Sequence, residues 1–132
     1  MDTPFSNLEK VNVRYIVSDV RLGVEFYSNV LGFAIEMNPP SGFAMLTKGN
    51  LVLFLNEPGA GGAGQSMPDG TAPSPGGWNR IQLQTNDIAS AIDYLKSKDV
   101  KFRNELVTAP AGKQILFLDP SGNLIEMFEP TK

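Results

Sequence analysis

The chain contains the same pattern of segments twice. In both halves a strand-like segment leads into an aspartate and then into an amphipathic helix. The two aspartates, Asp19 and Asp87, are 68 residues apart (87 − 19), and Phe26 and Tyr94 stand at the same offset within the two helices (94 − 26). A repeat of this length indicates two equivalent supersecondary units that bury their apolar faces against each other. Paired units leave a concave surface along their seam, which is suited to binding a ligand.

Each unit is predicted to have the order β-α-β-β-β. In the first unit, residues 10–57, alternating polarity, an aspartate cap and turn residues predict a strand, a helix and three further strands at 11–17, 19–32, 33–37, 43–47 and 50–56. In the second unit, residues 78–130, the same signals predict a strand at 79–85, a helix capped by Asp87, and strands at 101–106, 113–118 and 123–128. We therefore predict a single α/β (α+β) domain over residues 1–132, in which two pseudo-symmetric units form a curved mixed sheet around a central cavity.

Between the units, residues 58–77 are too rich in glycine and proline for regular structure. Two interpretations stay open. The segment is either a flexible connector or a mobile flap over the seam, hinged at Gly76-Gly77 before Trp78. It is not a phosphate-binding loop, because its glycines are not followed by the Lys-Ser/Thr pair that such loops require.

Composition excludes several classes of function. The net charge is −3 and there is no basic run, so nucleic acid is not an expected partner. No membrane span or signal peptide is visible, so we expect a cytoplasmic protein without a membrane partner. The chain has no cysteine and no histidine, which removes thiol chemistry, the commonest transition-metal ligand and the commonest general base near neutral pH.

Two segments carry a resemblance to a known family. Phe26-Tyr-Ser-Asn-Val-Leu-Gly-Phe33 ends the first helix, and Asp119-Pro-Ser-Gly-Asn-Leu-Ile-Glu126 forms the last turn and the strand after it. Together with the paired units over residues 10–130, these segments resemble the vicinal oxygen chelate superfamily, which contains glyoxalase I, extradiol dioxygenases, fosfomycin-resistance enzymes and bleomycin-resistance proteins. The resemblance implies the glyoxalase/bleomycin resistance fold and a homodimer, often with units exchanged or paired between chains.

The resemblance also implies four positions for metal ligands in metal-dependent members. They correspond here to Asn12, Leu53, Arg80 and Glu126. The choice of Leu53 depends on the alignment of residues 50–53 with residues 123–126, and a shift of one residue in that alignment would select a neighbour of Leu53. Only Glu126 is a good donor, and a guanidinium carries a fixed positive charge and has no lone pair for a metal. We therefore predict no metal ligands and no cofactor, and we do not expect a divalent metal in the usual place.

The resemblance places Arg80 and Glu126 in one cavity, on adjacent strands. They are either a buried ion pair with a structural role only or part of a ligand site. Strand parity puts Asn12, Arg14 and Gln82 on the same side, and apolar walls are expected from residues such as Leu53 and Trp78. The predicted ligand-binding residues are thus Asn12, Arg14, Leu53, Trp78, Arg80, Gln82 and Glu126.

The function expected from this reading is metal-free binding of a small organic molecule, as in the bleomycin-resistance proteins that the chain resembles. The ligand class suggested by that branch is an antibiotic or secondary metabolite, which would be sequestered. The alternative is a glyoxalase-like lyase or isomerase with an atypical site, for which Glu126 is the best catalytic candidate. Whether the protein is an enzyme stays open at this point.

Overall fold

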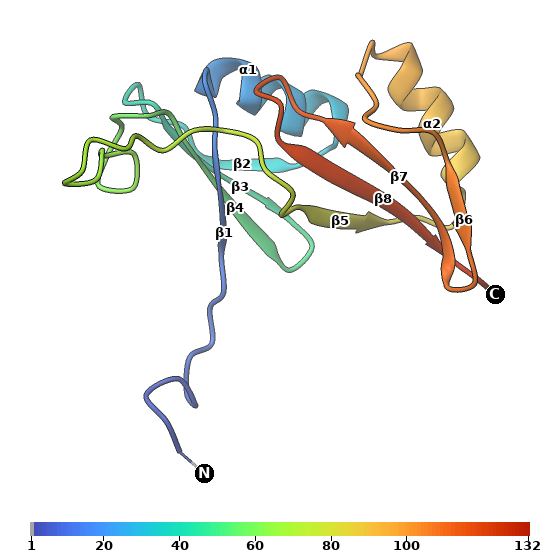
Figure 1. Ribbon diagram of the computed structural model, residues 1–132, viewed down its shortest axis with the longest axis horizontal. Coiled ribbons are helices and arrows are strands. Elements are labelled where there is room, and N and C mark those ends of the chain that lie inside the picture. Colours follow the sequence, from blue (N-terminus) through green and yellow to red (C-terminus); the bar gives the residue numbers. More distant parts are fainter. Residues whose placement is uncertain (1) are drawn as a thin grey trace.

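The computed structural model describes residues 2–132 and consists of two consecutive units, each with one four-stranded sheet (Figure 1). The first unit comprises β1 (Val13–Ile16), α1 (Val20–Glu25), a π-helical turn η1 (Phe26–Val30), β2 (Ala34–Met37), β3 (Phe43–Lys48) and β4 (Leu51–Asn56). The second comprises β5 (Ile81–Gln84), α2 (Ile88–Ser97), β6 (Val107–Ala109), β7 (Gly112–Leu118) and β8 (Leu124–Pro130). The longest helix, α2, has ten residues, and among residues 2–132 no helix is long and apolar enough to cross a membrane.

The two sheets have the same topology. Their strand orders are β1-β4-β3-β2 and β5-β8-β7-β6, with the first pair parallel in each sheet and the other pairs antiparallel. Val13 pairs with Leu53 in the first sheet, and Ile81 pairs with Ile125 in the second. The predicted two-unit fold is confirmed, and the eight strands found within residues 2–132 fall into two mixed sheets rather than one continuous ladder.

Two carboxylates hold the N-terminus of each helix. Asp19 and Asp87 accept backbone N–H bonds from the first turn that follows them, as predicted from the repeat. A second carboxylate also binds each helix N-terminus. Glu57, just after β4, accepts the N–H of Val20 at 2.8 Å, and Glu129, near the end of β8, accepts the N–H of the first α2 residue at 2.9 Å. Negative groups are stabilising here because the unsatisfied N–H groups give a helix N-terminus partial positive charge.

The units meet through a shared core and two buried tyrosines. The Tyr15 hydroxyl donates to the Leu124 carbonyl at 2.9 Å and accepts the Ile81 N–H at 2.8 Å, so one side chain of β1 bonds to the backbone of both β8 and β5. Tyr27 is fully buried and donates to Asp119 at 2.9 Å. Burial, followed by the nearby Asp119 charge, raises the pKa of Tyr27 well above its ordinary value.

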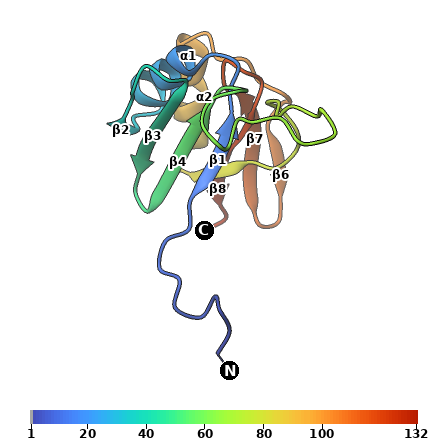
Figure 2. The same ribbon diagram turned by 90° about the vertical axis from the view of Figure 1, so that its left-hand side faces the viewer.

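Both helices lie on the same side of the sheets (Figures 1 and 2). The Tyr94 hydroxyl of α2 donates to the Val30 carbonyl at the end of η1 at 2.7 Å, which joins the two helical layers. Strand residues that point toward the helices are mostly buried, whereas most alternate residues on the other side are half-buried or exposed. Asn56 and Glu126 are buried exceptions on that other side. We call this second side of each sheet its open face.

One predicted strand is wrong. Residues 101–106 form only an isolated bridge, Phe102 to Phe117, and the edge strand β6 begins at Val107. The backbone N–H of Leu116 is taken by the side-chain oxygen of Asn104 at 2.9 Å, so a side chain replaces the ladder bond there. Asparagine competes with regular pairing in this way because its short amide reaches nearby backbone groups.

Candidate functional site

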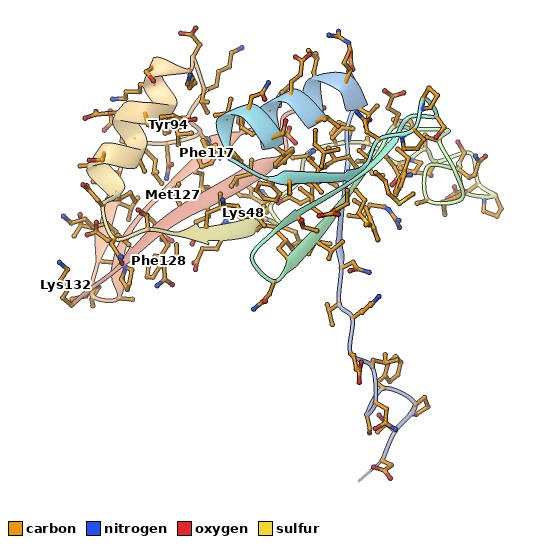
Figure 3. All side chains as sticks on the ribbon, turned by 180° about the vertical axis from the view of Figure 1, so that it is seen from behind. Lys48, Tyr94, Phe117, Met127, Phe128 and Lys132 are labelled. Atoms are coloured by element: carbon orange, nitrogen blue, oxygen red, sulfur yellow. The ribbon has the colours of Figure 1, made fainter. Side chains whose placement is uncertain are left out.

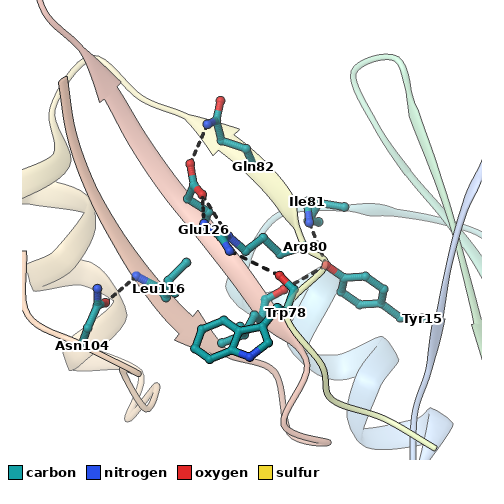
Figure 4. Close-up of polar contacts among 9 residues, drawn as sticks. Tyr15, Trp78, Arg80, Ile81, Gln82, Asn104, Leu116 and Glu126 are labelled. Atoms are coloured by element: carbon teal, nitrogen blue, oxygen red, sulfur yellow. Dashed lines mark hydrogen bonds and ion pairs between the residues drawn. The ribbon is translucent and has the colours of Figure 1, made fainter. Parts of the chain in front are cut away.

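A cluster of polar side chains lies on the open face of the second unit, where β5 and β8 run in parallel. Arg80 donates from Nε and Nη2 to Oε1 of Glu126, at 2.9 and 2.8 Å (Figure 4). Gln82 lies directly opposite Glu126 in the register and donates from Nε2 to its Oε2 at 2.6 Å. The predicted pairing of Arg80 with Glu126 is therefore present, with side-chain exposures of 30% and 9%.

This geometry limits what Glu126 can do. Both of its oxygens already accept hydrogen bonds, and a positive charge lies next to one of them. The two side chains bear opposite charges, so each compensates the other at this point of the open face. The cluster is thus better built to present a fixed set of donors and acceptors than to abstract a proton.

Trp78 extends this cluster toward solvent. The residue is 65% exposed, and its backbone carbonyl accepts a bond from Arg80 Nη1 at 3.3 Å (Figure 4). The guanidinium of Arg103 lies 5.5 Å from the centroid of its ring. Trp78, Arg80, Gln82 and Glu126 form what we call the second half-site.

A different cluster lies on the open face of the first unit. Arg14 donates from Nε to the side-chain oxygen of Asn56 at 2.8 Å, and its guanidinium lies 4.8 Å from the centroid of the Phe54 ring. Asn56 is 3% exposed, and its amide nitrogen donates to the Ala60 carbonyl at 3.2 Å. This second bond fixes the orientation of the amide, so its oxygen faces the arginine.

Phe54 also lines a cavity of about 310 Å³. Asn12, Met45 and Val52 contribute to the same wall, and the oppositely charged Glu9 and Lys10 of the N-terminal segment also line the cavity. This volume is at the lower end of what small-molecule pockets require. Asn12, Arg14, Phe54 and Asn56 form what we call the first half-site.

Leu53 does not belong to either half-site. Leu53 is fully buried in the core. It pairs with Val13 in the first sheet as Ile125 pairs with Ile81 in the second, so Leu53 is the counterpart of Ile125. The counterpart of Glu126 is therefore Phe54, and the predicted alignment was shifted by one residue. A shift of one moves a side chain to the other face of a strand, so Leu53 points toward the helices.

The predicted residues thus fall into two groups. Over residues 2–132, no hydrogen bond or ion pair joins Asn12 or Arg14 to Arg80, Gln82 or Glu126. Asn56 was missed from the sequence, although it shares strand parity with Val52 and Phe54 on β4. A polar residue closing an apolar strand, as Asn56 does, was the available signal.

The segment 58–77 is anchored more firmly than its composition suggests. Its first part is held by Asn56 on Ala60 and by Gln65, whose amide donates to two carbonyls within the loop at 3.0 and 2.9 Å. Its last part is held where the Gly76 N–H donates to the Asn123 side chain at 2.8 Å. Two of these three anchors are side chains outside the segment, so its own sequence does not reveal them.

Other hollows are less suited to a ligand. A groove of about 200 Å³ follows the seam on the helix side, with Lys48, Tyr94 and Met127 among its lining residues (Figure 3). Larger hollows of about 420 and 590 Å³ lie beside Asp119 and Glu57, but these carboxylates already bind backbone N–H groups. The half-sites offer the more specific chemistry.

The residues at the implied metal positions do not fit a metal. With the register corrected they are an asparagine, a phenylalanine, an arginine and one carboxylate, and the carboxylate is occupied by the arginine. In the part of the chain that the structure describes, no group of three or more His, Cys, Asp or Glu side chains is placed to hold an ion. Transition-metal sites need such sets of donors.

Residues 11–127 match the model of the Glyoxalase/Bleomycin resistance protein/Dioxygenase superfamily. The chain belongs to this superfamily. No functionally curated protein matches it significantly. The resemblance to the vicinal oxygen chelate superfamily is thereby confirmed.

Solved structures share the fold over nearly the whole chain. A superfamily member from Sphaerobacter thermophilus is 27% identical, with a TM-score of 0.72, over 92% of this chain and 98% of its own. TnmS3, an antibiotic binding protein from Streptomyces, is 22% identical (TM-score 0.70, 95% and 98%). A lactoylglutathione lyase from Agrobacterium tumefaciens is 17% identical (TM-score 0.71, 94% and 96%). The latter two likenesses extend to the fold alone.

Proposed function

We propose that this protein binds a small organic molecule without a catalytic metal. The observation that carries the proposal is the ion pair of Arg80 with Glu126. By the family resemblance, Arg80 stands at a position where metal-dependent members carry a ligand, and here it supplies a positive charge instead. A cation already paired with the remaining carboxylate repels a divalent ion and leaves a polar surface that suits carbonyl, amide or carboxylate groups.

The ligand class to examine first is an antibiotic or other secondary metabolite. Among the structural neighbours, TnmS3 is described as an antibiotic binding protein, and the chain resembles the bleomycin-resistance branch in having a metal-free set of residues. The half-sites support this choice because they combine aromatic rings, Phe54 and Trp78, with amide and guanidinium donors. Such a mixture is typical of pockets for mid-sized organic molecules.

We further propose that the protein is a homodimer in which a second copy covers part of the open faces. Their apolar residues are only half-buried within one chain: Phe43, Met45, Val52, Phe54, Leu116 and Phe128. The N-terminal segment, which extends away from the units in Figures 1 and 2, exposes Phe5, Leu8 and Val11. Light scattering coupled to gel filtration measures the assembly, and a monomer at micromolar concentration would contradict it. The cytoplasmic location stays a prediction.

The experiment combines metal analysis with a ligand screen. Protein purified without chelator is examined for zinc, iron, nickel and manganese, and thermal unfolding is then followed against a panel of antibiotics and metabolites. We expect substoichiometric metal and a ligand-dependent rise in stability of roughly 2.7 kcal/mol at about 100 times the Kd. About one metal ion per chain, lost on Glu126→Gln, would overturn the proposal.

A glyoxalase-like lyase or isomerase is the alternative, and the buried carboxylate of Glu126 is the observation that favours it. Turnover of a thiol–carbonyl adduct that requires Glu126 but survives Glu57→Gln would establish the enzyme. Glu57 is a matched control because its carboxylate caps α1 and lies outside both half-sites. Binding without turnover supports the binding protein.

A further inference from the structure

The arginine of the first half-site differs from that of the second in one respect, which is charge compensation. Arg80 is neutralised by Glu126, whereas the residue opposite Arg14 in the register of β1 and β4 is Phe54. Within residues 2–132, Arg14 forms no salt bridge, and its one hydrogen bond goes to the neutral side chain of Asn56. The first half-site therefore holds an uncompensated positive charge in a chain whose net charge is −3.

Arg14 is also held in position. Its Nε–H is fixed by Asn56, and one face of the guanidinium lies over the Phe54 ring. Both contacts restrict a side chain that would otherwise lose much rotamer entropy on binding. Asn56 itself is buried and oriented by its bond to Ala60, so the support reaches into the loop after β4.

The contacts that Arg14 makes leave a particular edge of the guanidinium for a ligand. Nε is used, and in the part of the chain described here Nη1 and Nη2 donate to no acceptor. These two nitrogens carry a parallel pair of N–H bonds, which matches the two oxygens of a carboxylate. Phe54, whose ring centroid lies 4.8 Å from this guanidinium, lines the 310 Å³ cavity together with Met45 and Val52. Glu9 and Lys10 line the same cavity with opposite charges.

We infer that Arg14 anchors the carboxylate of an organic ligand whose apolar body lies against Phe54 in the adjoining cavity. This inference rests on the proposed binding function and names the ligand chemistry: an acid with an aromatic or aliphatic body, recognised by a bidentate pair of hydrogen bonds from Nη1 and Nη2. Asn12, on the same cavity wall, offers an amide to a second polar group of the ligand.

The test uses pairs of probes that differ only in charge: naphthoate and naphthamide, phenylacetate and phenylacetamide, octanoate and octanamide. Each is titrated into the full chain by heteronuclear NMR, with the Arg14 Nε–H signal as a local reporter. We expect the acid of at least one pair to bind about tenfold or more tightly than its amide, because hydrogen bonds to a charged group are the stronger ones. The preference should shrink as sodium chloride is raised.

Arg14→Met should remove the acid preference while the amide binds as before, and Arg14→Lys should restore only part of it, since a lysine keeps the charge without the paired donors. Arg21→Met is the matched control, because Arg21 is an exposed arginine on α1 with its own acidic neighbours. An acid preference that survives Arg14→Met, or no measurable binding of any of the three acids at millimolar concentration, would overturn the inference. Equal binding of acids and amides would also overturn the inference about Arg14, but it would leave the proposed binding function standing. A stoichiometric metal would overturn only the proposed metal-free function.

Discussion

Removing the arginine of the second half-site should cost more stability than its partial exposure suggests. Arg80→Met deletes two donors, at 2.9 and 2.8 Å from Oε1 of Glu126, and leaves a carboxylate that is 9% exposed with Gln82 as its remaining partner. Breaking a fully buried pair costs roughly 3–5 kcal/mol. Because the Arg80 side chain is 30% exposed, solvent screens part of the interaction, and we expect about 2 kcal/mol.

The double variant separates the pair from its parts. Glu126→Leu leaves an arginine that can turn toward water, so its cost should be smaller, about 1–2 kcal/mol. Arg80→Met with Glu126→Leu leaves no unpaired charge, and its cost should fall below the sum of the single variants by about 1–2 kcal/mol. The same double variant should abolish recognition of a polar ligand at this half-site, because the donors and acceptors are gone.

Urea unfolding at one fixed protein concentration measures the three free energies of unfolding, since assembly makes the midpoint concentration-dependent. The control cycle uses Arg21→Met and Glu25→Leu on α1, where the pair is 3.6 Å apart and both side chains are more than half exposed. That cycle should give a coupling below about 0.5 kcal/mol. Single-variant effects on Arg80 and Glu126 that add to within about 0.3–0.5 kcal/mol would refute the reasoning.

Three further expectations follow from the structure. Tyr15→Phe should cost about 1–3 kcal/mol of unfolding free energy, because it leaves the buried Ile81 N–H and Leu124 C=O without their partner. Burial raises the pKa of Tyr15, so the stability that its protonated hydroxyl contributes is present below the ordinary tyrosine pKa of about 10 and is lost as pH rises through the higher folded pKa. Tyr15→Phe should remove this alkaline loss of stability. Elemental analysis should find less than one transition metal per ten chains, and a stoichiometric metal would contradict this order-of-magnitude expectation. If the segment 66–75, which lies between the two anchored ends, is a flap, then shortening it should weaken ligand binding more than it lowers stability and should change Trp78 fluorescence. Unchanged ligand affinity would show that the segment is only a connector.

The fold could be predicted from the sequence because its secondary-structure signals are local and occur twice. Asp19 and Asp87 cap helices at the same offset, and two copies of a strand–cap–helix order support each other in a way that a single copy does not. The prediction failed where a side chain replaced backbone pairing, as Asn104 does beside β7. No periodicity reports such a bond, because it depends on which strand lies opposite.

The site was predicted in part for a related reason. Arg80 and Glu126 were paired correctly because the resemblance fixed both positions, and the register of β5 and β8 placed them together. Leu53 was misplaced because an apolar strand such as β4 gives no alternation from which to read its faces. Whether a carboxylate compensates the charge of Arg14 depends on what lies opposite it, which only the register of β1 and β4 reveals.

The two half-sites occupy corresponding strands, so a single substitution should give the first half-site the carboxylate that the second one has. Phe54 corresponds to Glu126 and lies directly opposite Arg14, just as Gln82 lies opposite Glu126. Phe54→Glu should therefore pair with Arg14, neutralise the first half-site and reduce the preference for acids over amides to about onefold, from roughly tenfold before. Phe54 is only half-buried, so the fold should tolerate the change.

Phe54→Gln is the matched control, because it has the same shape as the glutamate variant and leaves the charge of Arg14 uncompensated. The acid preference should persist in this variant, although both variants lose the ring that lies under the guanidinium at 4.8 Å. NMR titration with the acid and amide probes measures both variants side by side. If glutamate and glutamine at this position give the same preference, the charge of Arg14 does not select the ligand, and the cavity wall alone accounts for binding.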